Sequence, residues 1–261
     1  MEKTFALVAG IASILGFMLG VATTRWGRNV LKDLARGLTV PFLGIRLVRM
    51  GVYDFFDSRT TLTHRRKTTH AFEYLSPAVK EVGIIALSLN YSIMHQNLHD
   101  ELRKLLKTRN ELKIYVFLLD PASPLVETVA AASARTPGEL REYINQSWTR
   151  LSRMAATLDY SEQQRFHLHQ YNTYIANSVL VVDPYEKDGR ITVENYLYKV
   201  PIDGRYSFEC KRPGSPMFEK VRAAYERFKE DFAGQANMQL QATGGPHAQR
   251  MHPTAQKPQG A

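Results

Sequence analysis

The chain has very little cysteine and none of the compact motifs by which enzymes are often identified. Its 261 residues include one cysteine, Cys210, which excludes an intrachain disulfide and a cysteine-rich metal site and favours a reducing compartment. No Walker loop, GxGxxG, GxSxG, HExxH or CxxC pattern occurs. The sequence therefore gives no sign of the usual nucleotide-hydrolysing, dinucleotide-binding, serine-hydrolase or zinc-protease chemistry, and no cofactor is predicted.

Acidic residues are scarce in one part of the chain. Residues 24–70 hold ten lysine or arginine residues against three acids, whereas the formal net charge of the whole chain is +9. The rest of the chain is thus nearly neutral. A neutral body with one basic segment argues against a general nucleic-acid-binding domain and favours an anionic partner near that segment.

Charge is absent from the 20 residues between Phe5 and Thr24. As a helix rising about 1.5 Å per residue, this run would cover the hydrocarbon core of a bilayer, about 30 Å thick. The cations follow the run and the residues before it are only Met-Glu-Lys-Thr, so an uncleaved anchor (1–25) is favoured over a cleaved signal peptide or a buried core helix. The positive-inside rule then predicts a single span in the inner membrane, with the C-terminal body in the cytoplasm.

Small residues recur every four positions along this run, at Ala12, Gly16 and Gly20. They form a stripe on which a second helix backbone could approach closely, as in a homodimer. Glycine is also frequent in membrane helices generally, so the stripe is equally compatible with a monomer.

The basic segment, 26–70, begins with a stretch, 26–56, that combines apolar residues at helical spacing with interleaved cations and then breaks at Pro41 and Gly44. This pattern is typical of an amphipathic helix in the headgroup layer, and a solvated linker that obeys the positive-inside bias is the alternative. The predicted membrane-surface residues are Arg25, Trp26, Arg28, Lys32, Arg36, Arg46 and Arg49.

Beyond residue 70, short apolar runs alternate with helical segments, which predicts one layered α/β domain with a mixed sheet over 71–233. The tail, 234–261, contains no acid, is rich in glycine, glutamine, proline and alanine, and is expected to be disordered. Strands are expected at 82–89, 112–120, 166–171, 177–183 and 191–198, and helices at 71–81, 91–110, in two segments of 124–157 divided at Pro137, and at 216–232.

One strand ends in LLDP (118–121) and another in VLVVD (179–183), and the order of elements around them resembles the phospholipase D-like fold, notably small bacterial members with one repeat. The resemblance covers 71–233. Active members of that family carry His-x-Lys-x4-Asp, in which the His attacks phosphorus, the Lys binds phosphate oxygens and the Asp supports the His. In this sequence Ala176 stands at the nucleophile position, Ser178 at the lysine position, and Asp183 matches the aspartate.

Alanine has no nucleophilic atom and serine has no fixed charge, so the family's covalent chemistry cannot be carried over. The resemblance therefore implies a pseudoenzyme whose former phosphate cleft binds a phosphate-bearing ligand or a partner protein. It also implies that a chain with one repeat would need to dimerise to complete a family-type site. By analogy of fold, a sensor or effector in bacterial signalling or phage defence is expected.

Two histidine pairs keep an enzyme hypothesis open. His95 and His99 are four residues apart on a predicted helix, and His167 and His169 are two apart on a predicted strand, so each pair shares a face. Together with Asp183, the strand pair could perform catalysis. The helical pair has metal-ligand spacing, but it is typical of solvated side chains beside an apolar stripe, so no metal site is predicted.

Ligands of open α/β sheets usually bind at the carboxyl ends of buried strands. Ser88, Asn90 and Tyr91 occupy such a position, and with His95 and Asp120 they are the predicted ligand-binding residues. The sequence thus favours a membrane-anchored cytoplasmic sensor or ligand-binding module. A phosphodiesterase of the phospholipase or nuclease type, and a membrane scaffold that tethers a partner protein, are the alternatives.

Overall fold

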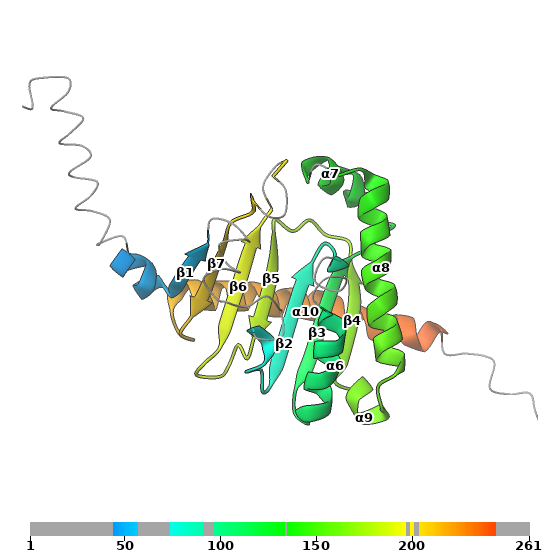
Figure 1. Ribbon diagram of the computed structural model, residues 1–261, viewed down its shortest axis with the longest axis horizontal. Coiled ribbons are helices and arrows are strands. Elements are labelled where there is room, and N and C mark those ends of the chain that lie inside the picture. Colours follow the sequence, from blue (N-terminus) through cyan, green and yellow to red (C-terminus); the bar gives the residue numbers. More distant parts are fainter. Residues whose placement is uncertain are drawn as a thin grey trace, which may run out of the picture. The chain divides into compact units, whose positions relative to one another are not determined.

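The chain divides into two compact units, Met1–Gly51 and Val52–Ala261. In the first unit, the structure describes a helix at 44–50 and the turn that follows it (Figure 1). In the second unit it describes an α/β domain. The computed structural model describes residues 44–56, 74–90, 97–133, 135–196, 199–200 and 204–243. In the last of these ranges, side chains are described as far as Phe232.

Within the described residues of the second unit, seven strands form one mixed sheet in the order β1-β7-β6-β5-β2-β3-β4. β2, β3 and β4 run parallel, and the other neighbouring pairs are antiparallel. The predicted α/β class and mixed sheet are confirmed. The strands are β1 Val52–Phe56, β2 Glu81–Ala86, β3 Lys113–Leu119, β4 Phe166–Tyr171, β5 Asn177–Val182, β6 Arg190–Asn195 and β7 Ser207–Lys211.

Helices between the parallel strands cover one face of the sheet (Figure 1). The connection from β2 to β3 holds α6, in which leucines recur at three- and four-residue spacing and are buried. Together with Leu151 of α8 and Val116 of β3, they form one core cluster. The described helices between the parallel strands are α6 Leu98–Thr108, α7 Leu125–Ala132, α8 Pro137–Ala156 and the short α9 Tyr160–Gln163, and the buried residues of α7 belong to the other core cluster.

The start of α8 follows from local sequence. The Thr136 hydroxyl accepts a hydrogen bond from the Glu139 N–H at 3.2 Å, and the Glu139 carboxylate accepts one from the Thr136 N–H at 2.8 Å. These two bonds form a capping box, and Pro137 occupies the first helical turn, where its missing N–H costs nothing. The predicted start of this helix is confirmed.

The other face of the sheet is covered by the last helix, α10 (Pro216–Thr243), which crosses behind the strands in Figure 1. Phe218 and Tyr225 of α10 are buried in a second core cluster with Phe117 of β3 and Tyr171 of β4. Successive residues of β3 therefore enter different clusters, because strand side chains alternate between faces. Both faces of the central strands are buried, which explains their nearly continuous apolar sequence.

The two ends of the domain differ from the sequence pattern. The amphipathic pattern predicted within 26–56, with its break at Pro41 and Gly44, does not continue as a helix through 52–56, because these residues form β1 and pair with β7. This segment is rich in valine, tyrosine and phenylalanine, and pairing with a distant strand decides its structure. At the other end, α10 continues to Thr243, whereas the pattern ends this helix at residue 232.

Among the helices of the described residues, none combines the length and the apolar content needed to cross a bilayer. The predicted span lies outside this part of the chain, as do Ala12, Gly16, Gly20 and the membrane-surface candidates from Arg25 to Arg36. The anchor, its small-residue stripe and its orientation therefore stay predictions.

Candidate functional site

The predicted ligand-binding residues follow the carboxyl ends of the parallel strands, and their hydrogen bonding differs from one residue to the next. Asp120 follows β3, and its Oδ1 accepts a hydrogen bond from the backbone N–H two residues later at 2.8 Å, so this carboxylate fixes its own turn. Ser88 and Asn90 follow β2, and within the described part of the chain the buried Oδ1 of Asn90 has no hydrogen-bond partner. Tyr91 and His95 lie outside the described residues.

Tyr196 connects three strands at this edge of the sheet. It follows β6, and its Oη accepts a hydrogen bond from the backbone N–H of Leu87, just past β2, at 3.3 Å. The same side chain is hydrogen-bonded to Ser178 of β5. Burial raises the pKa of Tyr196 to about 12, so the phenol stays neutral and donates or accepts hydrogen bonds without acting as a base near neutral pH.

A buried ion pair lies beside Ser178. Glu194 of β6 is the register partner of Ser178, and its carboxylate is 3.8 Å from the guanidinium of Arg205. Only 5% of Arg205 is exposed, and its guanidinium carbon lies 4.9 Å from the centre of the Tyr196 ring. A fixed positive charge thus lies near Ser178, although Glu194 balances it.

The same face of the sheet stays polar across β6 and β7. Register partners share a face, so Ser178 and Glu194 stand in one row with Ser207, and Thr192 stands with Glu209 in the next row. Ser207 and Glu209 are 3% and 1% exposed. We call these five residues the polar sheet face.

Sequence reasoning missed the polar sheet face, and the only available signal was charge within a strand. The carboxylate of Glu209 lies 3.4 Å from the Tyr74 hydroxyl and 3.8 Å from the Lys211 ammonium. A glutamate at such a position normally indicates a solvent-facing residue, because buried carboxylates are rare unless they are paired. Of these two partners, Tyr74 is distant in sequence and Lys211 is in the same strand, so no local pattern identifies the position of Glu209.

The predicted face shared by His167 and His169 is confirmed, and it points toward α10. The His167 ring stacks on Tyr115 with centroids 4.6 Å apart, and the His169 ring lies 5.3 Å from Phe117. His169 is 7% exposed, and both of its ring nitrogens are buried without a hydrogen-bond partner among the described residues. Burial lowers its pKa to about 4, so this imidazole is neutral near pH 7.

The Asp183 carboxylate is hydrogen-bonded to the backbone at the start of β2, away from the two histidines. Its carboxylate accepts hydrogen bonds from the backbone N–H groups of Val79, Lys80 and Glu81 at 2.8, 2.7 and 2.8 Å, which fixes the start of β2. β2 and β3 separate β5 from β4, so Asp183 is at least about 14 Å from His169 at about 4.8 Å per strand. The structure does not bring these predicted catalytic residues together.

Only one member of the helical pair His95 and His99 lies within the described residues. His95 lies outside the described residues, and the Nε2 of His99 is 3.6 Å from Asp100 Oδ2, an exposed neighbour. Over the described ranges, no group of three or more histidine, cysteine, aspartate or glutamate side chains converges as a metal would require.

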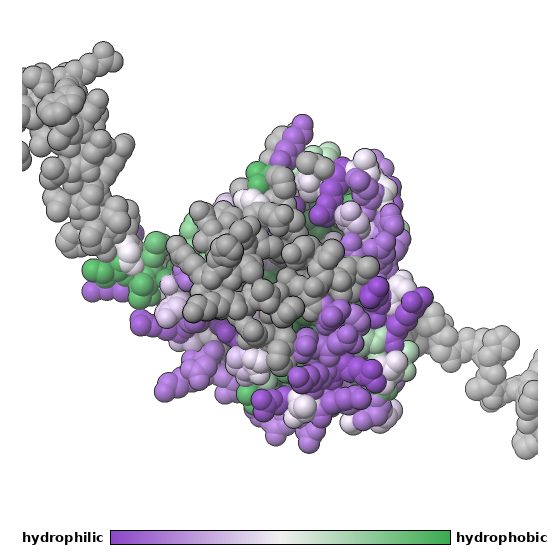
Figure 2. All heavy atoms as spheres, in the orientation of Figure 1, coloured by the Kyte–Doolittle hydropathy of each residue, from purple (hydrophilic) through white to green (hydrophobic). Residues whose placement is uncertain are grey.

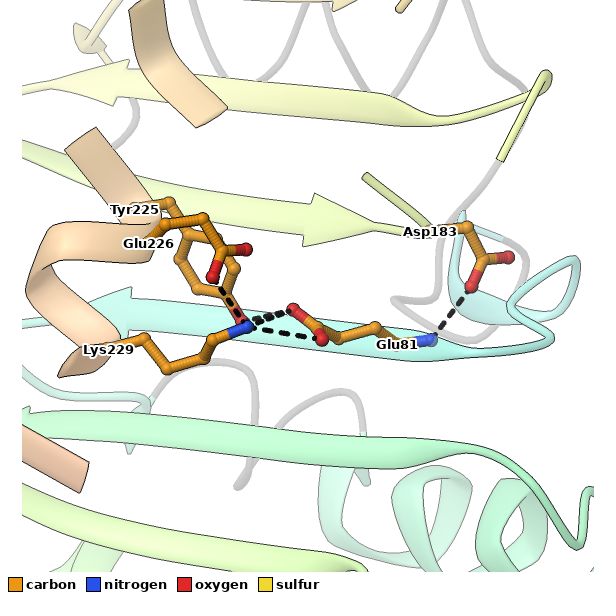
Figure 3. Close-up of polar contacts among 5 residues, drawn as sticks. All are labelled: Glu81, Asp183, Tyr225, Glu226 and Lys229. Atoms are coloured by element: carbon orange, nitrogen blue, oxygen red, sulfur yellow. Dashed lines mark hydrogen bonds and ion pairs between the residues drawn. The ribbon is translucent and has the colours of Figure 1, made fainter. Parts of the chain in front are cut away.

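A further polar network lies between the start of β2 and α10 (Figure 3). The Lys229 ammonium is 3.2 Å from Glu81 and 2.8 Å from Glu226, and the Tyr225 hydroxyl donates to Glu81 at 2.8 Å. Burial raises the pKa of Tyr225 far above its usual value. Burial alone lowers the pKa of Lys229, but the hydrogen bond to Glu226 and the charges of both carboxylates outweigh it and leave that pKa raised. Both groups keep their ordinary protonation state near pH 7, so the network clamps α10 to the sheet rather than transferring protons.

No protein-family model matches the sequence, and no curated protein matches it. The site is therefore interpreted from its own residues.

Proposed function

We propose that the protein is a membrane-anchored cytoplasmic module that binds a phosphate-bearing ligand without cleaving it, on a catalytically degenerate phospholipase D-like domain. The observation that carries this proposal is the environment of Ser178. A hydroxyl stands where the family has a cation, Tyr196 is bonded to it, and the Arg205–Glu194 ion pair lies beside it. Ala176, two residues earlier, offers no nucleophile.

This group of residues suits binding better than catalysis. The hydroxyls of Ser178 and Tyr196 and the guanidinium of Arg205 are all capable of donating hydrogen bonds to phosphate oxygens. They lie at the carboxyl end of β2 and the start of β5, at the edge where α/β sheets bind ligands. Because a phosphate would share Arg205 with Glu194, we expect modest affinity.

The membrane part of the proposal rests on the sequence. The uncharged run 5–24 has the length of a bilayer span, and the cations that follow it place the body on the cytoplasmic side. The anchor would hold the domain close to the phosphate groups of the inner leaflet, or to a ligand produced there.

The test uses the full chain in detergent micelles, with inorganic phosphate as the binding probe and bis(p-nitrophenyl) phosphate as the substrate probe. We expect phosphate at about ten times its Kd to stabilise the fold by about 1.4 kcal/mol, with no release of nitrophenol. Ser178→Ala removes this stabilisation, whereas Ser152→Ala, a half-buried serine of α8, keeps it. Absence of any phosphate-dependent shift in the parent protein contradicts the binding proposal.

The alternatives predict other outcomes. Nitrophenol release that disappears in both His167→Ala and His169→Ala favours the phosphodiesterase. The feature in its favour is that the buried ring nitrogens of His169 have no hydrogen-bond partner in the part of the chain that the structure describes. A stable protein partner that co-purifies with the chain, with neither phosphate binding nor turnover, favours the scaffold.

A further inference from the structure

The helix at 44–50 exposes side chains that a packed helix would bury. Ile45, Leu47 and Val48 are 53%, 46% and 41% exposed. Figure 2 shows hydrophobic atoms at the surface of this helix. Single exposed aliphatic residues are ordinary, but three within four consecutive positions form an apolar surface that needs a partner.

The same helix carries two exposed arginines on one side. Arg46 and Arg49 are three residues apart, so they are neighbours on the helix surface. At 100° per residue, the apolar side chains occupy the rest of the circumference. A broad apolar face with a narrow cationic face is the pattern of a helix that lies in the plane of a membrane interface.

We infer that the helix 44–50 lies in the headgroup layer of an anionic bilayer, with Ile45, Leu47 and Val48 at the acyl boundary and both arginines on lipid phosphates. This inference rests on the proposed function in one respect, namely that the run 5–24 brings the helix to a membrane. Besides the span 5–24, the helix 44–50 then makes a second contact with the membrane, through inserted apolar side chains and through charge.

Charge favours lipid over a protein partner or a second copy of the chain. Residues 25–49 contain six arginines or lysines and a single acid, Asp33, so two copies of this region would repel one another. The cytoplasmic leaflet carries a negative surface potential that attracts such a segment.

The test places an environment-sensitive fluorophore on the full chain in vesicles of phosphatidylglycerol and phosphatidylcholine. Leu47→Cys carries the label, and the buried Cys210 thiol does not compete because burial raises its pKa to about 11. Val79→Cys, at a position that is 46% exposed in the second unit, is the matched control. Lipids with a nitroxide on the acyl chain should quench the label at residue 47 at least about twofold more than the label at residue 79.

Equal quenching at residues 47 and 79 overturns the inference, as does a blue-shifted emission at residue 47 without quenching, which indicates a protein contact. Equal quenching at residue 47 in vesicles of phosphatidylcholine alone overturns the anionic requirement. Failure of the anchor is distinguishable, because the chain then leaves the vesicles in an alkaline wash, whereas quenching at residue 47 before the wash still supports the helix contact.

Discussion

The ring of Tyr225 lies against Gly83 so closely that a β-carbon at residue 83 would overlap it. Tyr225 belongs to α10 and Gly83 to the middle of β2, so a missing side chain on the sheet makes room for an aromatic ring from the helix. The ring is held there by its hydroxyl, which donates to Glu81 at 2.8 Å. The contact fixes the position of α10 across the sheet.

Gly83→Ala should therefore destabilise the fold. Pushing the ring away strains a packed core and costs about 1–3 kcal/mol, measured by urea unfolding of the full chain in detergent. Gly138→Ala, in the first turn of α8, is the control, because a β-carbon there meets nothing within 4 Å. It should leave the free energy of unfolding unchanged or raise it by up to about 1 kcal/mol. Equal effects of the two substitutions would show that the Tyr225 contact is not tight.

Asp183→Ala should cost about 2–4 kcal/mol, because three backbone N–H groups at the start of β2 lose their acceptor. Asp183→Asn keeps one carbonyl oxygen and tolerates the left-handed backbone at this position, where φ is 48°, so it should cost less. Urea unfolding of both variants checks the order. If Asn were as damaging as Ala, charge rather than hydrogen-bond acceptance would be the main contribution.

Stability should fall in mild acid because of His169. Its pKa is about 4 in the folded protein against an ordinary 6.5, so the unfolded chain binds more protons between these values. The stabilisation of the folded state by the neutral His169 is complete above about pH 6.5. It is lost as the pH falls to about 4, which lowers the free energy of unfolding by up to about 3 kcal/mol. Between about pH 7.5 and about pH 4.5, the free energy of unfolding should fall less for His169→Phe than for the parent protein. His167→Phe should retain most of the drop, and an equal drop in His169→Phe and the parent would contradict the assignment.

The Cys210 thiol should be inert in the folded protein. Burial raises its pKa to about 11, so the reactive thiolate is scarce and shielded. Alkylation with iodoacetamide should be slow in buffer and rise steeply across the urea transition. By linkage, the thiol form stabilises the fold fully below about pH 9, and this contribution is lost as the pH rises toward 11. Rapid alkylation without denaturant would show that the β7 end of the sheet opens locally.

The central strands and the α8 cap were predictable from the sequence because local signals determine them. β2, β3 and β5 are apolar runs of strand length, and the Thr136–Glu139 capping box acts over three residues. β1 and β7 were not predicted, because each is short and partly polar, and the pairing that forms them joins residues far apart in sequence.

The candidate site was predictable only in its location at the strand ends. Ser178 was singled out only by a resemblance to the phospholipase D-like motif. Glu194 and Arg205 carry no local signal, since their pairing depends on how β6 and the segment before β7 meet. The shared face of His167 and His169 follows from strand alternation alone, whereas the distance of this pair from Asp183 depends on the strand order.

The pairing of Val52 with Cys210 has a consequence for biosynthesis. β1 leaves the ribosome long before β7, so during most of translation β1 has no strand to pair with. The residues before β1 have by then already left the ribosome. Sheet completion is a late event that must wait for nearly the whole chain. A product that stops short of Ser207 would leave β1 without a partner strand, and Phe56, which is buried in the folded protein, would be open to aggregation.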